Sequence, residues 1–481
     1  MTTSTTKKTR NALSAHSWIG VFLGAFLYLI CISGALSVFY QEWERWEQPN
    51  IPEFSETSPE RVQQVFDTFR QRYDTETEHY HVVLPTSGIP RLVVEDDHVA
   101  HFVSEEGELL EIEKPTFTTL LTHLHEFLHL PTNIGVVIVS LFGAMICGLI
   151  VSGIVAHKRI IKDAFRFRRG GSGLQQNIDL HNRIGVWASP FHLIIGVTGT
   201  YFGLAGIVLV IVAQAFYGGD REAVIGEVFT AEPELSLPIQ PVEVGKALAK
   251  TLELEPEGKP IFLTVHEPNT EGQFIEVYTK IQGKLIYSEN YRFKPDGTYI
   301  GSAGYKEGDL GKQAIYSLYR LHFGDFAGLP MKLVYFVLGM MLTLLATSGI
   351  NIWLLKQNRT ETRLARVWHG IVWGTPIALS VSAILVFTLQ YEGVAIFWVP
   401  LLLVVALAAG LTSMNKRRLQ QLTAFSLLSA LLVYGMTHQA GVFAIPSLLL
   451  NVPILLYAVY LLYRSRVDTP YLFDRDLEAA K

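Results

Sequence analysis

The sequence is short of charge and almost without cysteine. Only 17% of its 481 residues are charged, whereas 49% are hydrophobic, so an ordinary soluble enzyme is excluded. The two cysteines, Cys31 and Cys147, both stand inside apolar runs, and no disulfide framework is implied. The glycine-rich run at 170–173 neither follows a strand nor fits the spacing G-x-G-x-x-G, which argues against a nucleotide-binding loop. What remains is a chain built largely from long apolar stretches.

These stretches predict an α-helical integral membrane protein with about eight spans. The first run is about 24 residues long and no cleavage site follows it, so we expect it to be kept as an anchor. We assign four long spans to 11–40, 134–156, 184–213 and 331–355, and four additional, closely spaced spans to 368–463. A connecting loop at 157–183 and a tail at 464–481 complete this part of the chain.

Basic residues gather in every second connection, and this sets the predicted orientation. They precede the first span, follow the second, separate the fourth from the fifth and the sixth from the seventh, and follow the eighth. Because lysine and arginine are retained on the cytoplasmic side, we expect both termini and the basic loop 157–183 in the cytoplasm. The long loops 41–133 and 214–330 then face outward. They are acidic, with 19 acidic against 6 basic residues in the first and 17 against 11 in the second.

Each outer loop has the pattern of a small α+β domain. In 41–133 the segment PERVQQVFDTFRQRY places Val62, Val65, Phe66 and Phe69 at helical spacing, and strand-like segments follow. In 214–330 the segment PVEVGKALAKTLEL predicts a helix, and Pro-Asp-Gly marks a turn between strand-like segments. Five histidines of the outer segments are interpreted as scattered surface residues rather than a metal site: His79, His81, His98, His101 and His266.

The first and third spans carry the same sequence pattern. AHSWIGVFLGAFLYLICISGA aligns with LHNRIGVWASPFHLIIGVTGT and places His16 over His181. The segments that enter the second and fourth spans also match, LHEFLHLP with LHFGDFAGLP, which places His125 over His322. Both of these spans end in Ser-Gly-Ile. A unit of span, outer domain, histidine-bearing segment and span is therefore repeated in the same orientation, at about 11–160 and 176–357.

A parallel repeat predicts a pseudo-two-fold axis along the membrane normal, which brings equivalent residues face to face across a four-helix bundle. His16 would meet His181 near the cytoplasmic side, and His125 would meet His322 near the outer side. Two opposed neutral imidazoles are the axial ligands that a six-coordinate haem b needs. The chain has no Cys-x-x-Cys-His motif for covalent attachment. We therefore expect two non-covalent b haems, with these four histidines as ligands to the haem iron.

Four further residues compete for these roles or support them. His192 has no counterpart in the repeat, but it follows His181 by eleven residues. On one helix that spacing is about 20° from the same face and roughly 16 Å along the axis, and a ligand there would shorten a long electron step. His129, four residues after His125, lies on the same helical face and is a rival metal ligand. His369 opens the fifth span, and Arg183 is a candidate partner for a haem propionate.

The blocks LHNRIGVW…TG and LHFGDFAGLP…SGI, with a small α+β domain between paired spans, resemble the PepSY-associated transmembrane family of iron-regulated membrane proteins over about residues 10–357. That family includes haem-containing ferrisiderophore reductases of the bacterial inner membrane. The resemblance implies two periplasmic PepSY-like domains, two b haems, and reduction of siderophore-bound ferric iron that releases Fe²⁺ for uptake. The four C-terminal spans go beyond the minimal four-span pattern.

Two classes of function stay open. The first is a haem-dependent ferric-chelate reductase; since no predicted cytoplasmic stretch can hold a flavin or NAD(P)H domain, its electrons would come from a quinone or another protein. The second is a non-redox membrane anchor whose periplasmic domains bind peptides or a partner protein. A transporter is a weaker interpretation, because apart from histidines the spans contain almost no ionisable residues. We favour the first class, with a ferric chelate and membrane lipid as partners and no nucleic acid.

Overall fold

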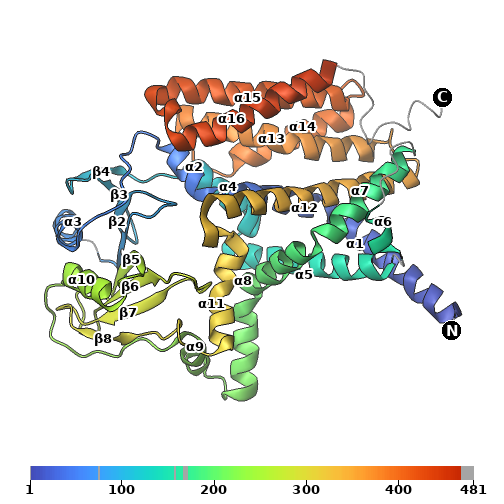
Figure 1. Cartoon of the computed structure of the whole chain (residues 1–481). Coiled ribbons are helices and arrows are strands. Elements are labelled where there is room, and N and C mark those ends of the chain that lie inside the picture. The colour runs from blue at the N-terminus through green and yellow to red at the C-terminus, as the bar shows by residue number, and fades with distance from the viewer. Residues whose placement is uncertain (1, 74–75, 157–158, 166–171, 467–481) are drawn as a thin grey trace. The chain divides into compact units, whose positions relative to one another are not determined.

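The computed structural model describes residues 2–73, 76–156, 159–165 and 172–466 (Figure 1). The chain divides into two compact units. The helical unit takes Met1–Pro49, Pro115–Leu204 and Pro330–Lys481, and the sheet unit takes Asn50–Lys114 and Ala205–Leu329. Each unit is therefore assembled from segments that are far apart in the sequence. Part of the predicted basic loop 157–183 lies outside the described residues.

Seven helices of the described residues are long and apolar enough to cross a membrane, which makes the chain a multi-pass membrane protein. Four of them correspond to the long predicted spans: α1 (Thr2–Ser37), α5 (Thr132–Ala156), α8 (Ser189–Phe216) and α12 (Gly328–Lys356). The other three are α13 (Arg363–Leu389), α15 (Lys416–His438) and α16 (Ile445–Arg466). An eighth span is predicted near 394–412, and the helix found there, α14 (Ala395–Gly410), is apolar but has only 16 residues.

The predicted third span is divided between two helices. α7 (Gly173–Trp187) ends at Trp187, and α8 starts at Ser189. Pro190 has no N–H with which to continue the hydrogen bonds of α7, which is a physical reason for the break. His181 therefore lies in α7 and His192 in α8, and they do not share one uninterrupted helix as the spacing argument assumes.

α1, α5, α8 and α12 pack on one another in that order. His16 of α1 contacts Leu149 of α5, and the close approach of α5 to α8 needs glycine, since a methyl group at Gly143 would lie 2.9 Å from the carbonyl oxygen of the facing glycine in α8. α8 reaches α12 through a hydrogen bond from His192. α12 returns to α1, where a methyl group at Gly339 would lie 3.1 Å from a side chain of α1. Small residues let membrane helices pack this closely, and the arrangement agrees with the predicted four-helix bundle.

The four C-terminal helices belong to the same unit, and α15 and α16 among them pack against the short helix α2 (Tyr40–Glu47). Trp46 of α2 stacks on Tyr434 of α15 with ring centroids 4.6 Å apart, and its indole N–H donates to the Asn451 side chain of α16 at 2.9 Å. The Tyr434 hydroxyl in turn donates to the Trp46 carbonyl oxygen at 2.9 Å. The remaining short elements of the unit are α4 (Thr116–Phe127), α6 (Ile160–Asp163) and a 3-10 turn at Gln439–Phe443.

The strands of both long loops form one antiparallel sheet of eight strands, in the order β4-β3-β2-β1-β5-β6-β7-β8 (Figure 1). The two loops join where β1 pairs with β5, with Tyr80 opposite Val265 and Val82 opposite Leu263. The sequence predicts two separate small domains, whereas their strands share this one sheet. The strands are β1 (His79–Val83), β2 (Leu92–Asp96), β3 (Ala100–Val103), β4 (Leu109–Ile112), β5 (Lys259–His266), β6 (Phe274–Lys280), β7 (Glu289–Phe293) and β8 (Tyr299–Ser302).

Two helices, α3 (Pro59–Arg72) and α10 (Val244–Leu254), cover one face of this sheet (Figure 1). The predicted apolar face of the first is confirmed, because Val62, Val65, Phe66 and Phe69 are fully buried in the core that the helices share with the strands. The sheet unit also contains α9 (Arg221–Phe229), α11 (Leu310–Phe323) and a 3-10 turn at Asp325–Ala327.

A buried ion pair ties α12 to α2 within the helical unit. The Lys332 ammonium lies 2.8 Å from both carboxylate oxygens of Glu42 and 2.9 Å from the side-chain oxygen of Gln41. The side chains of Lys332 and Glu42 are only 5% and 8% exposed. Lys332 falls inside the predicted span 331–355, where almost no ionisable residue was expected. A buried charge is tolerated only when it is paired, so each residue depends on the other.

We expect Lys332→Met to lower the thermal unfolding temperature of the detergent-purified protein, because it leaves the Glu42 carboxylate buried without its partner. Removing one member of a buried pair costs about 3–5 kcal/mol. The double substitution Glu42→Gln with Lys332→Met removes both charges and should recover most of that loss. Equal destabilisation of the single and the double variant would show that the two residues are not coupled.

Candidate functional site

His16 of α1 and His181 of α7 lie side by side in the helical unit. Their ring centroids are 6.2 Å apart, and the ring planes are nearly perpendicular, at 88°. Both side chains are half-buried. Equivalent positions of the two repeats therefore meet at one point, although they are far apart in the sequence.

Each of these imidazoles is held by the Ser-Gly-Ile segment of a neighbouring helix. Nδ1 of His16 lies 2.9 Å from the Leu149 carbonyl oxygen and 3.2 Å from Ser152 Oγ, both in α5. Nδ1 of His181 lies 2.8 Å from Ser348 Oγ in α12. Both serine hydroxyls also donate to the carbonyl oxygen three residues earlier, at 3.1 Å and 3.2 Å. The two halves of the repeat thus make the same contact.

These partners place the ring proton on Nδ1 of both histidines. A carbonyl oxygen can only accept, so His16 donates from Nδ1. The Ser348 hydroxyl already gives its proton to the Leu345 carbonyl, so it accepts from His181 in the same way. A neutral imidazole with the proton on Nδ1 keeps its lone pair on Nε2. Both rings can therefore offer Nε2 to a metal ion, and two such donors suit the axial positions of a haem iron.

Glycine leaves the space that the two rings occupy. A methyl group at Gly153 would lie 3.3 Å from Cε1 of His16, and one at Gly349 would lie 3.5 Å from Cε1 of His181. The first distance is tighter than most side-chain contacts, and the second is ordinary van der Waals contact. The Ser-Gly pair of α5 therefore has two roles, since Ser152 holds Nδ1 and Gly153 lets the ring pack closely against the helix. At Gly349 of α12 a side chain would also fit.

His125 of α4 is held in a similar manner by α1. Its Nδ1 lies 2.9 Å from the Ile30 carbonyl oxygen, so this ring also carries its proton on Nδ1. A methyl group at Gly34 would lie 2.5 Å from Cε1 of the ring, so this close approach requires glycine. Glu47 of α2 fixes the start of α4, because its carboxylate accepts from two backbone N–H groups there at 2.7 Å and 2.6 Å.

The positions of three other candidates leave their predicted roles untested. His322 lies in α11 of the sheet unit, with its ring 5.8 Å from that of Phe323, so its pairing with a histidine of the helical unit stays a prediction. Arg183 donates from Nε to the carbonyl oxygen of residue 164 at 3.1 Å, and its guanidinium lies over the Trp187 ring at 5.5 Å. His369 is half-buried in α13.

His192 and His129 carry the ring proton on the other nitrogen. Each donates from Nε2 to a carbonyl oxygen, His192 to Leu338 at 3.3 Å and His129 to Leu120 at 2.7 Å. Their Nδ1 atoms are buried without a hydrogen-bond partner in the part of the chain that the structure describes. An unpaired buried polar atom costs about 1–3 kcal/mol. Both residues therefore stay rival ligands, through Nδ1 rather than Nε2.

Comparison with known proteins agrees with this architecture. The chain matches the family described as PepSY-associated TM region over residues 13–356. It is also similar to the uncharacterized protein PA4219 of Pseudomonas aeruginosa, with 26% identity over 267 residues. That similarity covers 52% of this chain and 65% of the relative's length. The family match includes both repeats and both Ser-Gly-Ile segments, and it stops before the four C-terminal helices.

We expect His16→Ala and His181→Ala to remove the same haem from the purified protein, because each deletes one of two opposed ligands. His322→Ala should leave that haem in place. The haem content by pyridine haemochromogen assay and the absorption spectrum of each variant measure this. If His181→Ala and His192→Ala remove different haems while His16→Ala removes neither, α7 and α8 supply both sites and the symmetric pairing is wrong.

Proposed function

The chain belongs to the PepSY-associated transmembrane family, and on that premise we propose that it is a haem b-dependent ferric-chelate reductase. It takes electrons from a quinol or a protein donor and passes them across the membrane to ferric iron. The proposed form of this iron is a ferric siderophore. The observation that carries the proposal is the His16–His181 pair, in which hydrogen bonds at both Nδ1 atoms leave both Nε2 lone pairs to a metal.

The residues around this pair suit a haem. Hydrogen bonds at Nδ1 orient both rings and make Nε2 a better donor. The bundle helices beside the pair are apolar, and both rings are half-buried among them. A bound haem b supplies a one-electron carrier whose reduction potential depends on its axial ligands and their hydrogen bonds.

Two histidine positions along α1 support an electron path with two haem sites. His16 lies in the middle part of this helix, and His125 is held at Ile30, closer to its C-terminal end. Fourteen residues separate His16 from Ile30, which is about 21 Å along a helix. An electron that entered at the His16–His181 pair would therefore need a second site, and His125 with His322 is the pair that the repeat offers.

Ferric iron is the proposed substrate because one electron changes how tightly it is held. Fe²⁺ carries less charge than Fe³⁺ and prefers softer ligands, so reduction weakens binding to hard oxygen chelators and lets the iron leave. Loops 41–133 and 214–330 carry an acidic excess, 19 to 6 and 17 to 11. Such a surface attracts cationic chelates and the released Fe²⁺, and it repels anionic chelates.

We place the protein in a bacterial inner membrane, with both termini in the cytoplasm and the sheet unit in the periplasm. The support is the distribution of lysine and arginine, which mark the connections on one side of the predicted spans. In this orientation the His16–His181 pair lies toward the cytoplasm, where the electrons would enter. The sheet unit lies in the periplasm, where the ferric chelate would bind.

We expect protein purified in detergent from haem-replete cells to be red and to hold two low-spin b haems per chain. A reduced-minus-oxidised difference spectrum and the haem-to-protein ratio measure this. A ratio of one haem per chain would be consistent with a haem at His16 and His181 and would reject a second haem site. A colourless protein would reject the reductase and favour a non-redox anchor whose sheet unit binds peptides or a partner protein.

We expect the reduced protein to pass electrons to a ferric siderophore. In the assay, dithionite-reduced and desalted protein meets the ferric complex together with a ferrous-specific chromophore, and haem reoxidation should match the Fe²⁺ captured. Buffer taken through the same desalting step, and His181→Ala at equal concentration, serve as controls and should capture at least about tenfold less Fe²⁺. If the haems stay reduced with every ferric chelate but reoxidise with a quinone or a protein partner, the protein still carries electrons across the membrane. The assignment of a ferric chelate as substrate is then wrong.

A further inference from the structure

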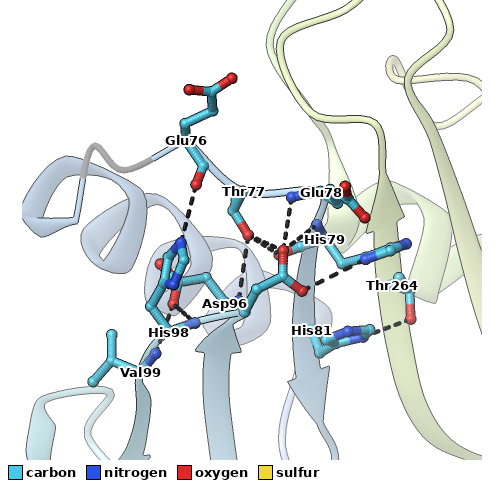
Figure 2. A network of polar contacts seen from close by, with 10 residues as sticks. Glu76, Thr77, Glu78, His79, His81, Asp96, His98, Val99 and Thr264 are labelled. Atoms are coloured by element: carbon cyan, nitrogen blue, oxygen red, sulfur yellow. Dashed lines mark hydrogen bonds and ion pairs between the residues drawn. The ribbon is translucent and has the colours of Figure 1, made fainter.

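A second histidine cluster lies in the sheet unit, among residues that the proposed function does not use. His79, His81 and Asp97 each offer one donor atom, and these atoms all lie within 4.8 Å of one another. Figure 2 shows His79 and His81 following one another along β1, with Thr264 on the neighbouring strand. The sequence analysis interprets these histidines as scattered surface residues, whereas the fold brings two of them and a carboxylate together.

The strand β1 places two of the donors on one face of the sheet. Side chains alternate along a strand, so His79 and His81 point to one side and Tyr80 to the other. Tyr80 is buried in the core, whereas both histidines are only half-buried. Their rings lie almost parallel, 17° apart, with centroids separated by 5.7 Å.

Asp97 follows β2, and three donors orient its carboxylate. Oδ2 accepts from the Thr77 hydroxyl at 2.5 Å and from the backbone N–H groups of Glu78 and His79 at 2.7 Å and 3.2 Å. Oδ1 faces the His79 ring, 3.6 Å from Nδ1. Partial burial favours the neutral acid, but these hydrogen bonds and the nearby imidazole lower the pKa of Asp97 to about 2. The carboxylate is therefore ionised at neutral pH, with Oδ1 turned to the cluster.

His81 is also prepared to act as a ligand. Its Nδ1 lies 2.9 Å from the Thr264 hydroxyl oxygen, so Nε2 is the nitrogen left for a metal ion (Figure 2). Burial, followed by repulsion from the rings of His79 and His266, lowers the pKa of His81 below its usual value. A neutral imidazole keeps the lone pair that coordination requires.

His266 of β5 adds a further nitrogen beside the cluster. It is the register partner of His79, and the two rings lie 5.4 Å apart. Its Nε2 lies 3.3 Å from a carboxylate oxygen of Glu276, which is itself paired with Arg292 at 2.8 Å. Carboxylates that orient histidine rings in this way are common around bound metals.

We propose that His79, His81 and Asp97 bind a divalent first-row transition-metal cation. Two imidazoles and one carboxylate suit ions such as Zn²⁺ and Fe²⁺, whereas Ca²⁺ and Mg²⁺ prefer oxygen ligands. A tetrahedral ion with bonds of about 2.0–2.2 Å holds its donor atoms roughly 3.3–3.6 Å apart. The donors already lie within 4.8 Å of one another, and the side chains of His79 and Asp97 are 37% and 36% exposed. Side-chain rotation is therefore enough to close the site.

This site uses none of the residues proposed to bind haem. It stands on β1, on the turn after β2, and beside β5, which belongs to the second loop. A bound ion therefore lies next to the strand pair that joins the two halves of the sheet. Because an ion that binds only the folded state adds to its stability, metal binding should stabilise the sheet unit.

Zinc binding to the full-length protein in detergent tests the site, with Zn²⁺ as a probe that has no redox chemistry. After EDTA treatment and equilibrium dialysis, we expect wild-type protein to bind one more Zn²⁺ per chain than His81→Ala, with at least about tenfold higher affinity. His98→Ala is the matched control, because this exposed neighbour contacts the Glu76 carbonyl at 3.1 Å and is not part of the cluster (Figure 2). It should bind Zn²⁺ as the wild type does, even in excess Ca²⁺.

Asp97→Asn provides a second variant that keeps the shape of the side chain and removes its charge. It should weaken Zn²⁺ binding and lose the rise in thermal unfolding temperature that Zn²⁺ gives the wild type. Equal Zn²⁺ affinity in the wild type, His81→Ala and Asp97→Asn would overturn the proposal. Haem content should be the same in all of these proteins, so failure of this site and failure of the proposed reductase give different results.

Discussion

The ring N–H group of a histidine packed between helices needs an acceptor, and the packing of the helical unit provides one. Inside a membrane no water is at hand, so an unpaired polar group is strongly unfavourable. His16, His125 and His181 each donate from Nδ1 to another helix, which ties α1 to α5, α4 to α1 and α7 to α12. The same hydrogen bonds decide which nitrogen keeps its lone pair. The contacts that join these helices therefore also leave the lone pair of each ring on Nε2.

Other polar groups of the helical unit either follow the same rule or depart from it, and His192 is one of the departures. Lys332 and Glu42 neutralise each other while they join α12 to α2. His192 is fully buried and donates from Nε2, yet its Nδ1 has no partner among the described residues. A native structure keeps few such atoms, and each one needs an explanation. A ligand role would satisfy this nitrogen.

In the sheet unit, the proposed cation site lies where the two loops meet. The pairing of β1 with β5 places Tyr80 and Val82 in a shared core with the helices, and it turns His79 and His81 to the opposite face. Their position beside Thr264 and His266 depends on that pairing. The two units therefore rely on different constraints, since hydrogen bonds between helices position the haem-site candidates and strand register positions the proposed cation site.

Local pattern and internal symmetry made much of the helical unit predictable from the sequence alone. The spans follow from apolar length, the buried face of α3 from the spacing of Val62, Val65, Phe66 and Phe69, and the meeting of His16 with His181 from the repeat. The Ser-Gly-Ile segments were visible as a repeat, but their role was not, because a hydrogen bond from Nδ1 to Ser348 exists only once helices have packed. Only the tertiary structure joined both loops in one sheet and brought Asp97 to His79 and His81. Strand partners and turn geometry depend on contacts between distant residues, which alternation along a single strand does not encode.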